Sequence, residues 1–291
     1  MTADLDAATT FVHTNARVLE RHRLALLRGE AGGEPVVRAL LAYRNDDGGF
    51  GHGLEPDLRA PQSQPAGVQT AMELLHEAGR TGDDPLVAPA ADFLASVTRD
   101  DGGVPFVLEN AMPHPHGPPW RAADASSLTQ TAANAAALHA LGARHAWLDG
   151  ADAFLWERID ALDLGRAEPT PGLGYDVRFS IAFLDAHPDE ARAQAALDTL
   201  APGLRASGLV ATERDGDVHA PLDFSPWPDS RSRRLFTTDK LETDLDALAS
   251  GQESDGGWRF PWPEWSDGAT QEWRGVVTLH ALRVLRANGR L

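Results

Sequence analysis

The stretch Gln252-Glu253-Ser254-Asp255-Gly256-Gly257-Trp258 decides the fold, because two related stretches occur earlier in the chain. The first is Asn45-Asp46-Asp47-Gly48-Gly49-Phe50, and the second is Arg99-Asp100-Asp101-Gly102-Gly103-Val104. Each copy follows one stretch with a helical pattern of apolar residues and precedes another. The repeating unit is therefore a helix, an Asp-Gly-Gly loop and a second helix.

The spacing of the copies predicts how many units the chain contains. The Gly-Gly pairs of the first two copies are 54 residues apart and those of the last two are 154 apart, which leaves room for two less regular units. Candidate loops for these are Pro169 to Tyr175 and Gly203 to Gly208. The proline-rich stretch Ala220 to Asp229 is expected to be irregular and to lie over one end of the barrel. With a predicted helix from Leu5 to Leu27, the total is five to six hairpins.

A set of hairpins of this size closes into a ring instead of extending as a solenoid. No alternation typical of β-strands persists beyond a few residues. We therefore expect an all-α fold, an α/α toroid, that forms a single domain over residues 1–291.

The composition limits the possible partners. The chain has 26 basic and 43 acidic residues, a net charge of −17, which disfavours binding to nucleic acid or to an anionic membrane. It has no cysteine, so disulfides, thiolate nucleophiles and cysteine-bound zinc are excluded. The N-terminal residues lack the pattern of a signal peptide and no apolar run is long enough to span a bilayer. We expect a soluble cytoplasmic protein; the sequence does not specify an oligomeric state.

The loop from Gln252 to Trp258 resembles the glutamine-tryptophan repeat of squalene and oxidosqualene cyclases. Terpenoid cyclases and protein prenyltransferases fold as α/α toroids, and the resemblance covers nearly the whole chain. The segments Glu55 to Arg59 and Glu272 to Gly275 are also similar to uncharacterised bacterial proteins of a prenyltransferase-like branch. The resemblance implies a central cavity that binds a small, largely apolar ligand such as an isoprenoid.

The chain departs from the catalytic motifs of these families. It lacks the Asp-x-Asp-Asp motif that supplies the acid in one class of cyclase and the Asp-Asp-x-x-Asp motif that binds magnesium in another. It has no cysteine for the zinc site of the protein prenyltransferases. Phosphate-binding and dinucleotide-binding glycine motifs are missing too. We expect no cofactor and no metal. The sequence favours an enzyme over a protein without catalytic activity, but it does not decide between the two.

Four polar residues are the candidate catalytic residues, because they follow the first and last Gly-Gly turns. Glu55 and Asp57 stand two apart on a segment that Pro56 keeps extended, so both can face one side. Two close carboxylates raise the pKa of one of them, which suits acid catalysis. Glu272 and Arg274 lie at the predicted start of the last inner helix. The alternative is that all four form a structural ion-pair network.

Five further residues are candidate ligand-binding residues around the same loops: His52, Gln64, Trp262, Trp265 and Trp273. Tryptophans gather near the last turn, and aromatic rings can bind an apolar ligand, a sugar or a cation. Ring closure is expected to bring the first and last loops together at one mouth, with these residues beside the four polar ones.

The histidines give a weaker signal. His114 and His116 share a proline-rich loop and could reach one metal ion, but no third ligand has a suitable spacing, which favours a mobile loop. His76, His139 and His280 lie near the ends of predicted inner helices and are interpreted as structural.

Three functions remain open from the sequence. The first is an enzyme or binding protein for a small apolar ligand. The second is a carbohydrate-active toroid, a hydrolase, lyase or epimerase, that uses Glu55, Asp57 and Glu272 as its carboxylates. The third is a non-catalytic toroid that binds another protein.

Overall fold

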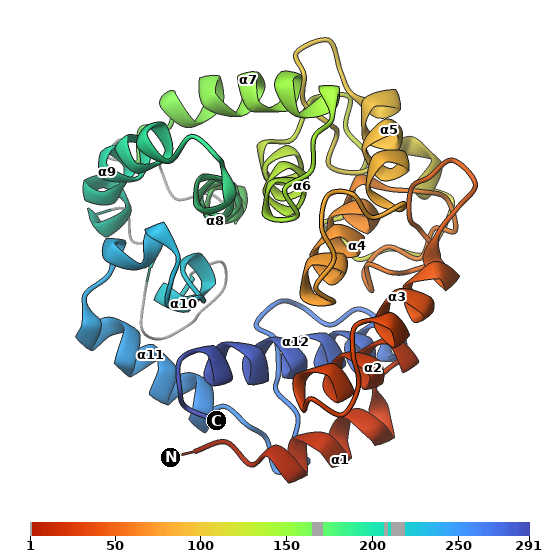
Figure 1. Ribbon diagram of the computed structural model, residues 1–291, viewed down its shortest axis with the longest axis vertical. Coiled ribbons are helices and arrows are strands. Elements are labelled where there is room, and N and C mark those ends of the chain that lie inside the picture. The colour runs from red at the N-terminus through yellow and green to blue at the C-terminus, as the bar shows by residue number, and fades with distance from the viewer. Residues whose placement is uncertain (1, 165–170, 207–208, 211–218) are drawn as a thin grey trace.

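The structure is a computed structural model that describes residues 2–164, 171–206, 209–210 and 219–291. The described residues are helical and contain isolated β-bridges but no β-strand. The helices form an outer and an inner ring, as Figure 1 shows. The fold is an α/α toroid, as predicted.

Outer and inner helices alternate along the chain. The outer helices are α1 (Leu5–Asn15), α3 (Glu34–Leu40), α5 (Val87–Val97), α7 (Ala146–Asp160), α9 (Glu190–Ala206) and α11 (Thr238–Ser250). The inner helices are α2 (Val18–Leu27), α4 (Pro65–Glu77), α6 (Leu128–Ala140), α8 (Pro171–Ala186), α10 (Pro221–Phe224) and α12 (Asp267–Ala287). Three short 3₁₀ helices are η1 (Leu41–Tyr43), η2 (Glu109–Ala111) and η3 (Arg231–Leu235).

The Gly-Gly turns occupy equivalent places, because each packs against the next outer helix of the ring. A Cβ on Gly48 would lie 2.5 Å from the carbonyl oxygen of Pro89 in α5, and the second copy packs on α7 in the same way. A Cβ on Gly256 would lie 2.2 Å from the carbonyl oxygen of Ala7 in α1. The last hairpin thus meets the first helix, which closes the ring.

An apolar seam supports this closure. Phe11 and Val12 of α1 belong to one buried cluster with Leu245 of α11, Trp258 and Leu282 of α12. A second and larger cluster runs through α3 to α9. Burial of apolar surface between the rings is the main stabilising contribution in such a layered fold.

The predicted helix from Leu5 to Leu27 is wrong in one respect: it is two helices. Ala16 is extended at φ −88° and ψ 161°, and the chain passes there from the outer ring to the inner ring. The guanidinium of Arg17 donates to the carbonyl oxygens of Gly53 and Leu54, both at 3.1 Å. This break is fixed by tertiary contacts, since neither residue is a helix breaker.

Two of the less regular units also differ from the prediction. Gly172 and Gly174 lie in the first turn of α8 and not in a loop, and Gly203 lies within α9. Pro169, Thr170 and Gly208 lie outside the described residues. The proline-rich stretch after Ala220 forms the one-turn helix α10 in an inner position, beside α8 and α11.

Candidate functional site

The loop that follows the first Gly-Gly turn holds Glu55 beside Asp57. The backbone N–H of Asp57 donates to Glu55 Oε1 at 3.1 Å, and the charge of Asp57 acts on the Glu55 carboxyl. The indole N–H of Trp265 donates to Asp57 Oδ1 at 2.6 Å. The backbone of the same loop accepts and donates hydrogen bonds with residues Pro115 and Gly117 of a later loop. The first and last loops therefore meet at this point.

Glu55 is the group at this mouth that is poised for proton transfer. Burial raises the pKa of its carboxyl to about 8, and the negative charge of Asp57 adds to the rise. The Asp57 N–H and the positive charge of Arg17 oppose it, while the charge of Glu73 raises it further. A general acid or base works best when its pKa lies near the working pH. Glu55 meets that condition at neutral pH.

Glu272 is engaged in ion pairs that join the ends of the ring. Its Oε2 lies 2.8 Å from Arg59 Nη1 and 3.7 Å from Arg17 Nη1. Arg59 belongs to the first loop, Arg17 immediately precedes α2, and Glu272 lies in the second turn of α12. Its carboxylate thus fixes the first loop to the last helix.

Arg274 lies apart from this group. Its guanidinium pairs with both carboxylate oxygens of Asp255 at 2.7 and 2.8 Å and covers the ring of Phe11 at 4.6 Å. In the first two copies of the repeat a serine hydroxyl, of Ser63 and of Ser126, donates to the equivalent aspartate. Arg274 therefore supports the third Gly-Gly turn in the place of a serine.

The three tryptophans fall into two groups. Trp265 bonds to Asp57, as above. Trp262 and Trp273 meet edge to face at 4.8 Å, and Phe260 stacks on Trp262 at 4.7 Å. The indole N–H groups of Trp262 and Trp273 are buried and find no acceptor among the described residues. A buried donor without an acceptor costs free energy, so these two N–H groups are candidates to bind a ligand or water.

His52 and Gln64 form hydrogen bonds that stabilise the loops around them. His52 is exposed, at φ 55°, and its Nε2 lies 2.9 Å from Asn45 Oδ1 in the first Asp-Gly-Gly turn. Gln64 is buried just before α4; its amide accepts from the backbone N–H of Leu108 at 2.9 Å and donates to Asn110 at 2.6 Å. Neither side chain joins the group around Glu55.

A second set of charged residues, which we call the interior cluster, lies on inner helices that surround the ring centre in Figure 1. It consists of Glu73 on α4, Arg178 on α8, and His280 and Arg283 on α12. The charges of Arg178 and Arg283 act on both Glu73 and His280. Arg178 and Arg283 are therefore near enough to both groups to act on them electrostatically.

Water reaches the interior cluster, yet protein surrounds it. Glu73 is exposed and the other three side chains are partly exposed. Nevertheless, burial raises the pKa of Glu73, lowers the pKa of His280 to about 4 and lowers the pKa of Arg283. The surroundings of these side chains therefore shift their pKa values although water reaches them.

Sequence reasoning missed the interior cluster. His280 was interpreted as a structural residue near a helix end, and the other three were not singled out. One signal was present in the sequence. An inner helix is enclosed, so a charged residue on it, such as Glu73 or Arg178, requires a partner or has a function. Trp273 and His280 are also seven apart, which places both on one face of α12.

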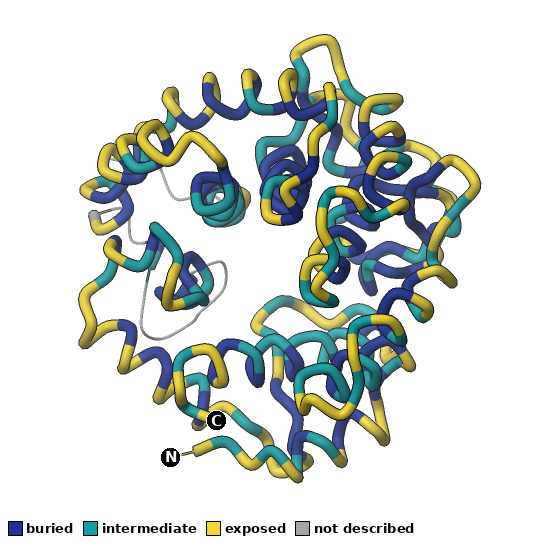
Figure 2. Tube along the Cα trace, viewed as in Figure 1, coloured by how far each residue is buried: buried dark blue, intermediate teal, exposed yellow. Residues whose placement is uncertain are grey.

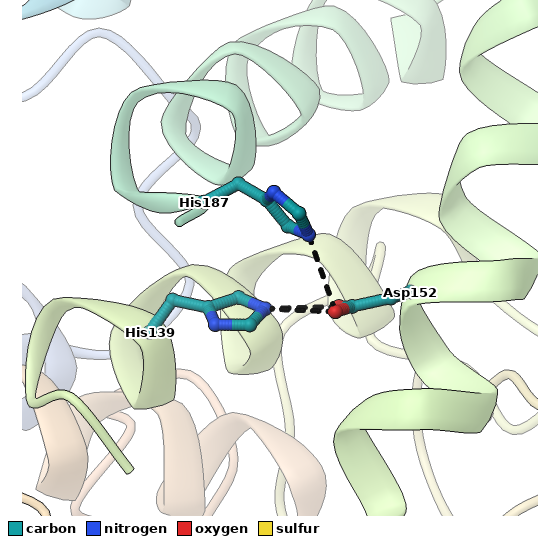
Figure 3. Close-up of side chains that lie close together, drawn as sticks. All are labelled: His139, Asp152 and His187. Carbon is teal, nitrogen blue, oxygen red and sulfur yellow. Dashed lines mark hydrogen bonds and ion pairs between the residues drawn. The ribbon is translucent and has the colours of Figure 1, made fainter. Parts of the chain in front are cut away.

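A group of possible metal ligands lies elsewhere, at His139 of α6, Asp152 of α7 and His187 just after α8 (Figure 3). Their ligand atoms all lie within 4.8 Å of one another. Asp152 accepts from His139 Nε2 at 2.9 Å and from His187 Nε2 at 3.3 Å. Two imidazoles and a carboxylate are a plausible set for a transition metal.

The tautomer of His187 argues against a metal there. Its Nδ1 accepts the backbone N–H of Asp189 at 3.0 Å, so in the neutral ring the proton is on Nε2, which then cannot bind a metal. The same bond recurs at His145, whose Nδ1 accepts from Trp147 and whose Nε2 lies 3.1 Å from Asp92. In both cases the histidine lies at the start of an outer helix and forms a hydrogen bond with an aspartate of the preceding outer helix. It is a structural feature of the repeat.

A surface hollow of about 600 Å³ lies beside the second Gly-Gly turn. It is bordered by Asp101 and Arg158, which form an ion pair at 3.5 Å, and by Ser126, which donates to Asp101 at 2.5 Å. These are the polar contacts of the turn itself. The hollow is therefore a structural feature of the repeat, and we do not assign a ligand to it.

Solved structures with the same fold support the toroid. A protein from Actinoplanes superposes with a TM-score of 0.54 at 17% identity, over 97% of this chain and 89% of that one. A type II terpene cyclase, MstE from Scytonema, in complex with its substrate geranylgeranyl dihydroxybenzoate, superposes with a TM-score of 0.53 at 12% identity, over 99% of this chain and 87% of that one. No family model and no curated protein matches the sequence. No helix in the described ranges has the length and apolar character that crossing a membrane requires. At these identities the neighbours establish the fold alone: the chain has the toroid architecture found in a terpene cyclase.

Proposed function

We propose that this protein is an enzyme that binds a small molecule inside the ring and transfers a proton through Glu55. The observation that carries the proposal is the placement of Glu55. Its carboxyl is fixed beside Asp57 at the mouth, burial raises its pKa to about 8, and it lies within electrostatic reach of Glu73 on the inner wall. Perturbed carboxyl groups in a recess are typical of active sites.

The other candidate residues serve as supports in this proposal. Trp265 holds Asp57, and the Arg59–Glu272–Arg17 ion pairs hold the loop that carries Glu55. We assign Glu272 a positioning role, because both arginines already use its carboxylate. Arg274 positions the third turn and does not contribute to the reaction.

The ligand we propose has an apolar portion. Trp262, Trp273 and Phe260 form an aromatic group at the start of α12, suited to contact with an apolar portion of a ligand. The substrate of the cyclase MstE, an isoprenoid joined to a polar aromatic acid, has this mixed character. A prenylated aromatic compound is therefore the first class to test.

The proposed reaction is not protonation of an alkene. A carboxyl group with a pKa near 8 is a weak acid, far from the strength that carbon protonation requires, and the Asp-x-Asp-Asp motif is missing. Glu55 is suited to transferring a proton to or from a heteroatom or an activated carbon acid. Glu73 of α4, whose pKa burial also raises, is the second carboxyl group in this proposal, and its charge acts on Glu55.

A carbohydrate-active enzyme is the second candidate, and the pair Glu55 and Glu73 is the observation that favours it. Two carboxyl groups with different environments are the basis of acid–base catalysis on sugars. The set proposed from the sequence is less suitable for this, because Asp57 and Glu272 are both held by other side chains. A protein-binding toroid is disfavoured by charged groups that water reaches in the interior.

Native mass spectrometry of the protein, purified without denaturation, tests for a bound ligand. Turnover is then measured with geranylgeranyl dihydroxybenzoate and with a panel of oligosaccharides. We expect turnover of one class, and loss of at least a hundredfold in kcat for Glu55→Gln with the fold intact by circular dichroism. Arg274→Gln should lower stability and leave kcat unchanged. A Glu55→Gln variant with full activity would refute the proposal.

A further inference from the structure

The guanidinium of Arg17, the residue that immediately precedes α2, contacts the peptide that carries Glu55. Its Nη1 donates to the carbonyl oxygens of Gly53 and Leu54, each at 3.1 Å. The Leu54 carbonyl belongs to the peptide bond between Leu54 and Glu55, and a peptide unit is planar. Arg17 therefore fixes the orientation of the unit from which the Glu55 side chain starts.

Other contacts hold the chain on the far side of Glu55. The backbone N–H of Leu58 donates to the carbonyl oxygen of Glu55 at 3.0 Å and closes a turn. The carbonyl oxygen of Asp57 accepts from the backbone N–H of Gly117 at 2.8 Å. Glu55 is thus held from both sides, and Arg17 supplies the hold on the side that precedes it.

Glu20 keeps Arg17 in place. The Nε and Nη2 atoms of Arg17 donate to the two carboxylate oxygens of Glu20, each at 2.9 Å, in a paired geometry. The Glu20 side chain is 1% exposed and that of Arg17 is 11% exposed. The guanidinium carbon also lies 5.8 Å from the ring centre of Tyr43, and Glu272 Oε2 lies 3.7 Å from Nη1. A planar guanidinium held in this way is a rigid support for the loop.

The stability of α2 does not account for an arginine at this place. Arg17 is the N-cap residue of α2. A cation near a helix N-terminus is unfavourable because of the helix dipole, and a small polar residue would cap the helix better. A buried ion pair such as that with Glu20 adds little net stability, since both groups lose their hydration. What the arginine provides here is its pair of hydrogen bonds to the loop.

We propose that Arg17 is a positioning residue for the proton transfer by Glu55, which it holds through the Leu54 peptide, and that Glu20 in turn orients Arg17. The inference rests on the proposed function and adds the residues that set the geometry of its central group. Misplacement of a reacting group by a fraction of its bond distances lowers the rate strongly, so this support matters for kcat.

The charge of Arg17 contributes as well. Burial and the charge of Asp57 raise the pKa of Glu55, the positive charge of Arg17 opposes them, and the charge of Glu73 of α4 adds to the rise. Loss of Arg17 should therefore raise the pKa of Glu55 further. Loss of Glu20 should lower it, because a negative charge is removed and the charge of Arg17 is less compensated.

The test follows the titration of the Glu55 carboxyl by carbon-13 NMR of the whole protein labelled at glutamate, with Glu55→Gln to assign the signal. The wild-type midpoint should be about 8. Arg17→Met should raise the midpoint and Glu20→Gln should lower it, each by about half a pH unit or more. A merely structural loss would expose Glu55 to water and lower the midpoint in both variants.

Arg17→Lys separates the charge from the geometry. Lysine keeps the positive charge but lacks the planar fork that bonds to Glu20 and to the Leu54 carbonyl at once. Its Glu55 midpoint should stay close to that of the wild type. Its kcat, measured with whichever substrate the wild type turns over, should fall about tenfold or more.

Arg23→Met is the matched control. Arg23 lies on the same helix with its side chain 8% exposed, and its guanidinium pairs with Glu77 at 2.9 Å. The variant loses the same charge from a similarly buried ion pair. Its stability should fall as in Arg17→Met, whereas the Glu55 midpoint and kcat should stay close to the wild-type values.

Two results would overturn the inference: shifts of the midpoint in the same direction in Arg17→Met and Glu20→Gln, or a midpoint and kcat in Arg17→Met that match those of Arg23→Met. If Arg17→Met fails to fold, Arg17→Gln replaces it, and a raised midpoint is still expected. The titration needs no substrate. Opposite shifts together with a fully active Glu55→Gln variant would refute proton transfer by Glu55 and leave its positioning by Arg17 and Glu20 standing.

Discussion

The indole of Trp265 donates a hydrogen bond of 2.6 Å to the carboxylate of Asp57, a residue 208 positions earlier in the chain. The bond ties the last loop of the toroid to the first, at the place where Asp57 stands beside Glu55. Trp265 also packs against Gly117, where a Cβ would lie 3.3 Å from its ring. The geometry of the Glu55–Asp57 pair thus depends on both ends of the chain.

We predict that Trp265→Phe lowers kcat at least tenfold. It should also cost about 1.5–3 kcal/mol of unfolding free energy, the usual range for one hydrogen bond to a charged group. Trp120→Phe is the control, since the Trp120 ring stacks on Phe106 at 5.0 Å. Its kcat should stay near the wild-type value. Steady-state kinetics and urea unfolding measure the two effects, and equal losses of kcat in both variants would contradict the role of the bond.

Glu55 should make the protein less stable as pH rises. Its pKa is about 8 in the folded state against 4.5 for the unfolded chain, so the folded state binds more protons between these values. The unfolding free energy should therefore fall between pH 4.5 and 8, by at most about 1.4 kcal/mol per pH unit from this group. Glu55→Gln should remove that slope and be the more stable form at pH 8.

His280 acts in the opposite direction at lower pH. Its pKa is about 4 in the folded state against 6.5 unfolded, so its contribution is lost as pH falls from 6.5 to 4. Between pH 6.5 and 8 the raised pKa of Glu73 acts in the same direction as that of Glu55, so the difference between wild type and Glu55→Gln isolates Glu55. Urea unfolding of wild type and Glu55→Gln at three pH values in that range checks the prediction; parallel curves would contradict it.

The third Gly-Gly turn should be essential for ring closure. Gly256 has φ +92°, and a Cβ there would lie 2.2 Å from the carbonyl oxygen of Ala7. Gly289 has φ +68° with nothing within 4 Å of the same position. Gly289→Ala should therefore cost only about 1 kcal/mol for the backbone conformation, whereas Gly256→Ala should cost several times more. Thermal unfolding compares the two, and similar melting temperatures would show that the seam does not depend on this contact.

The cluster at His139, Asp152 and His187 should act as a structural hydrogen-bond network. Asp152→Ala should lower the unfolding free energy by about 1–3 kcal/mol, because two enclosed imidazoles lose their acceptor. Zinc added to the metal-free wild type should leave its melting temperature unchanged. Asp92→Ala, at the more exposed His145 pair, should cost less. A rise in melting temperature with zinc that Asp152→Ala abolishes would contradict the tautomer argument.

Glu272→Gln should lower the melting temperature by several degrees, since it leaves Arg59 and Arg17 with one less carboxylate at the junction of the ring ends. We expect the Michaelis constant and kcat to change through the position of the first loop, and raised stability with normal kinetics would argue against this assignment. The control is Glu253→Gln, whose carboxylate forms an ion pair with the exposed Arg259 at 3.3 Å.

The burial pattern in Figure 2 shows why the outer and inner helices were distinguishable from the sequence. The α6 stretch from Gln130 to Leu138 is buried throughout, and its alanine-rich sequence predicted an enclosed helix. In α11, buried Leu241 and Leu245 alternate with exposed residues, as its amphipathic pattern predicted.

The repeat, the ring and the placement of Glu55 beside Asp57 are predictable from the amino-acid sequence, because all three depend on local geometry. A glycine at positive φ, an Asp whose carboxylate accepts the N–H two residues on, and a Glu-Pro-Asp segment impose their conformations on their neighbours wherever they occur. Repetition of one local unit then fixes the closed form.

Which charged side chains meet depends on how the ring closes. Arg274 and Glu272 are two apart on α12, yet one supports the third turn and the other binds Arg59 of the first loop. Arg178 and His280 reach the same interior from helices about a hundred residues apart. A charged side chain on a helix has the same pattern whether it faces bulk solvent or an enclosed recess. The difference lies in what surrounds it once the ring has closed, and that burial is what changes its pKa and gives it a chemical role.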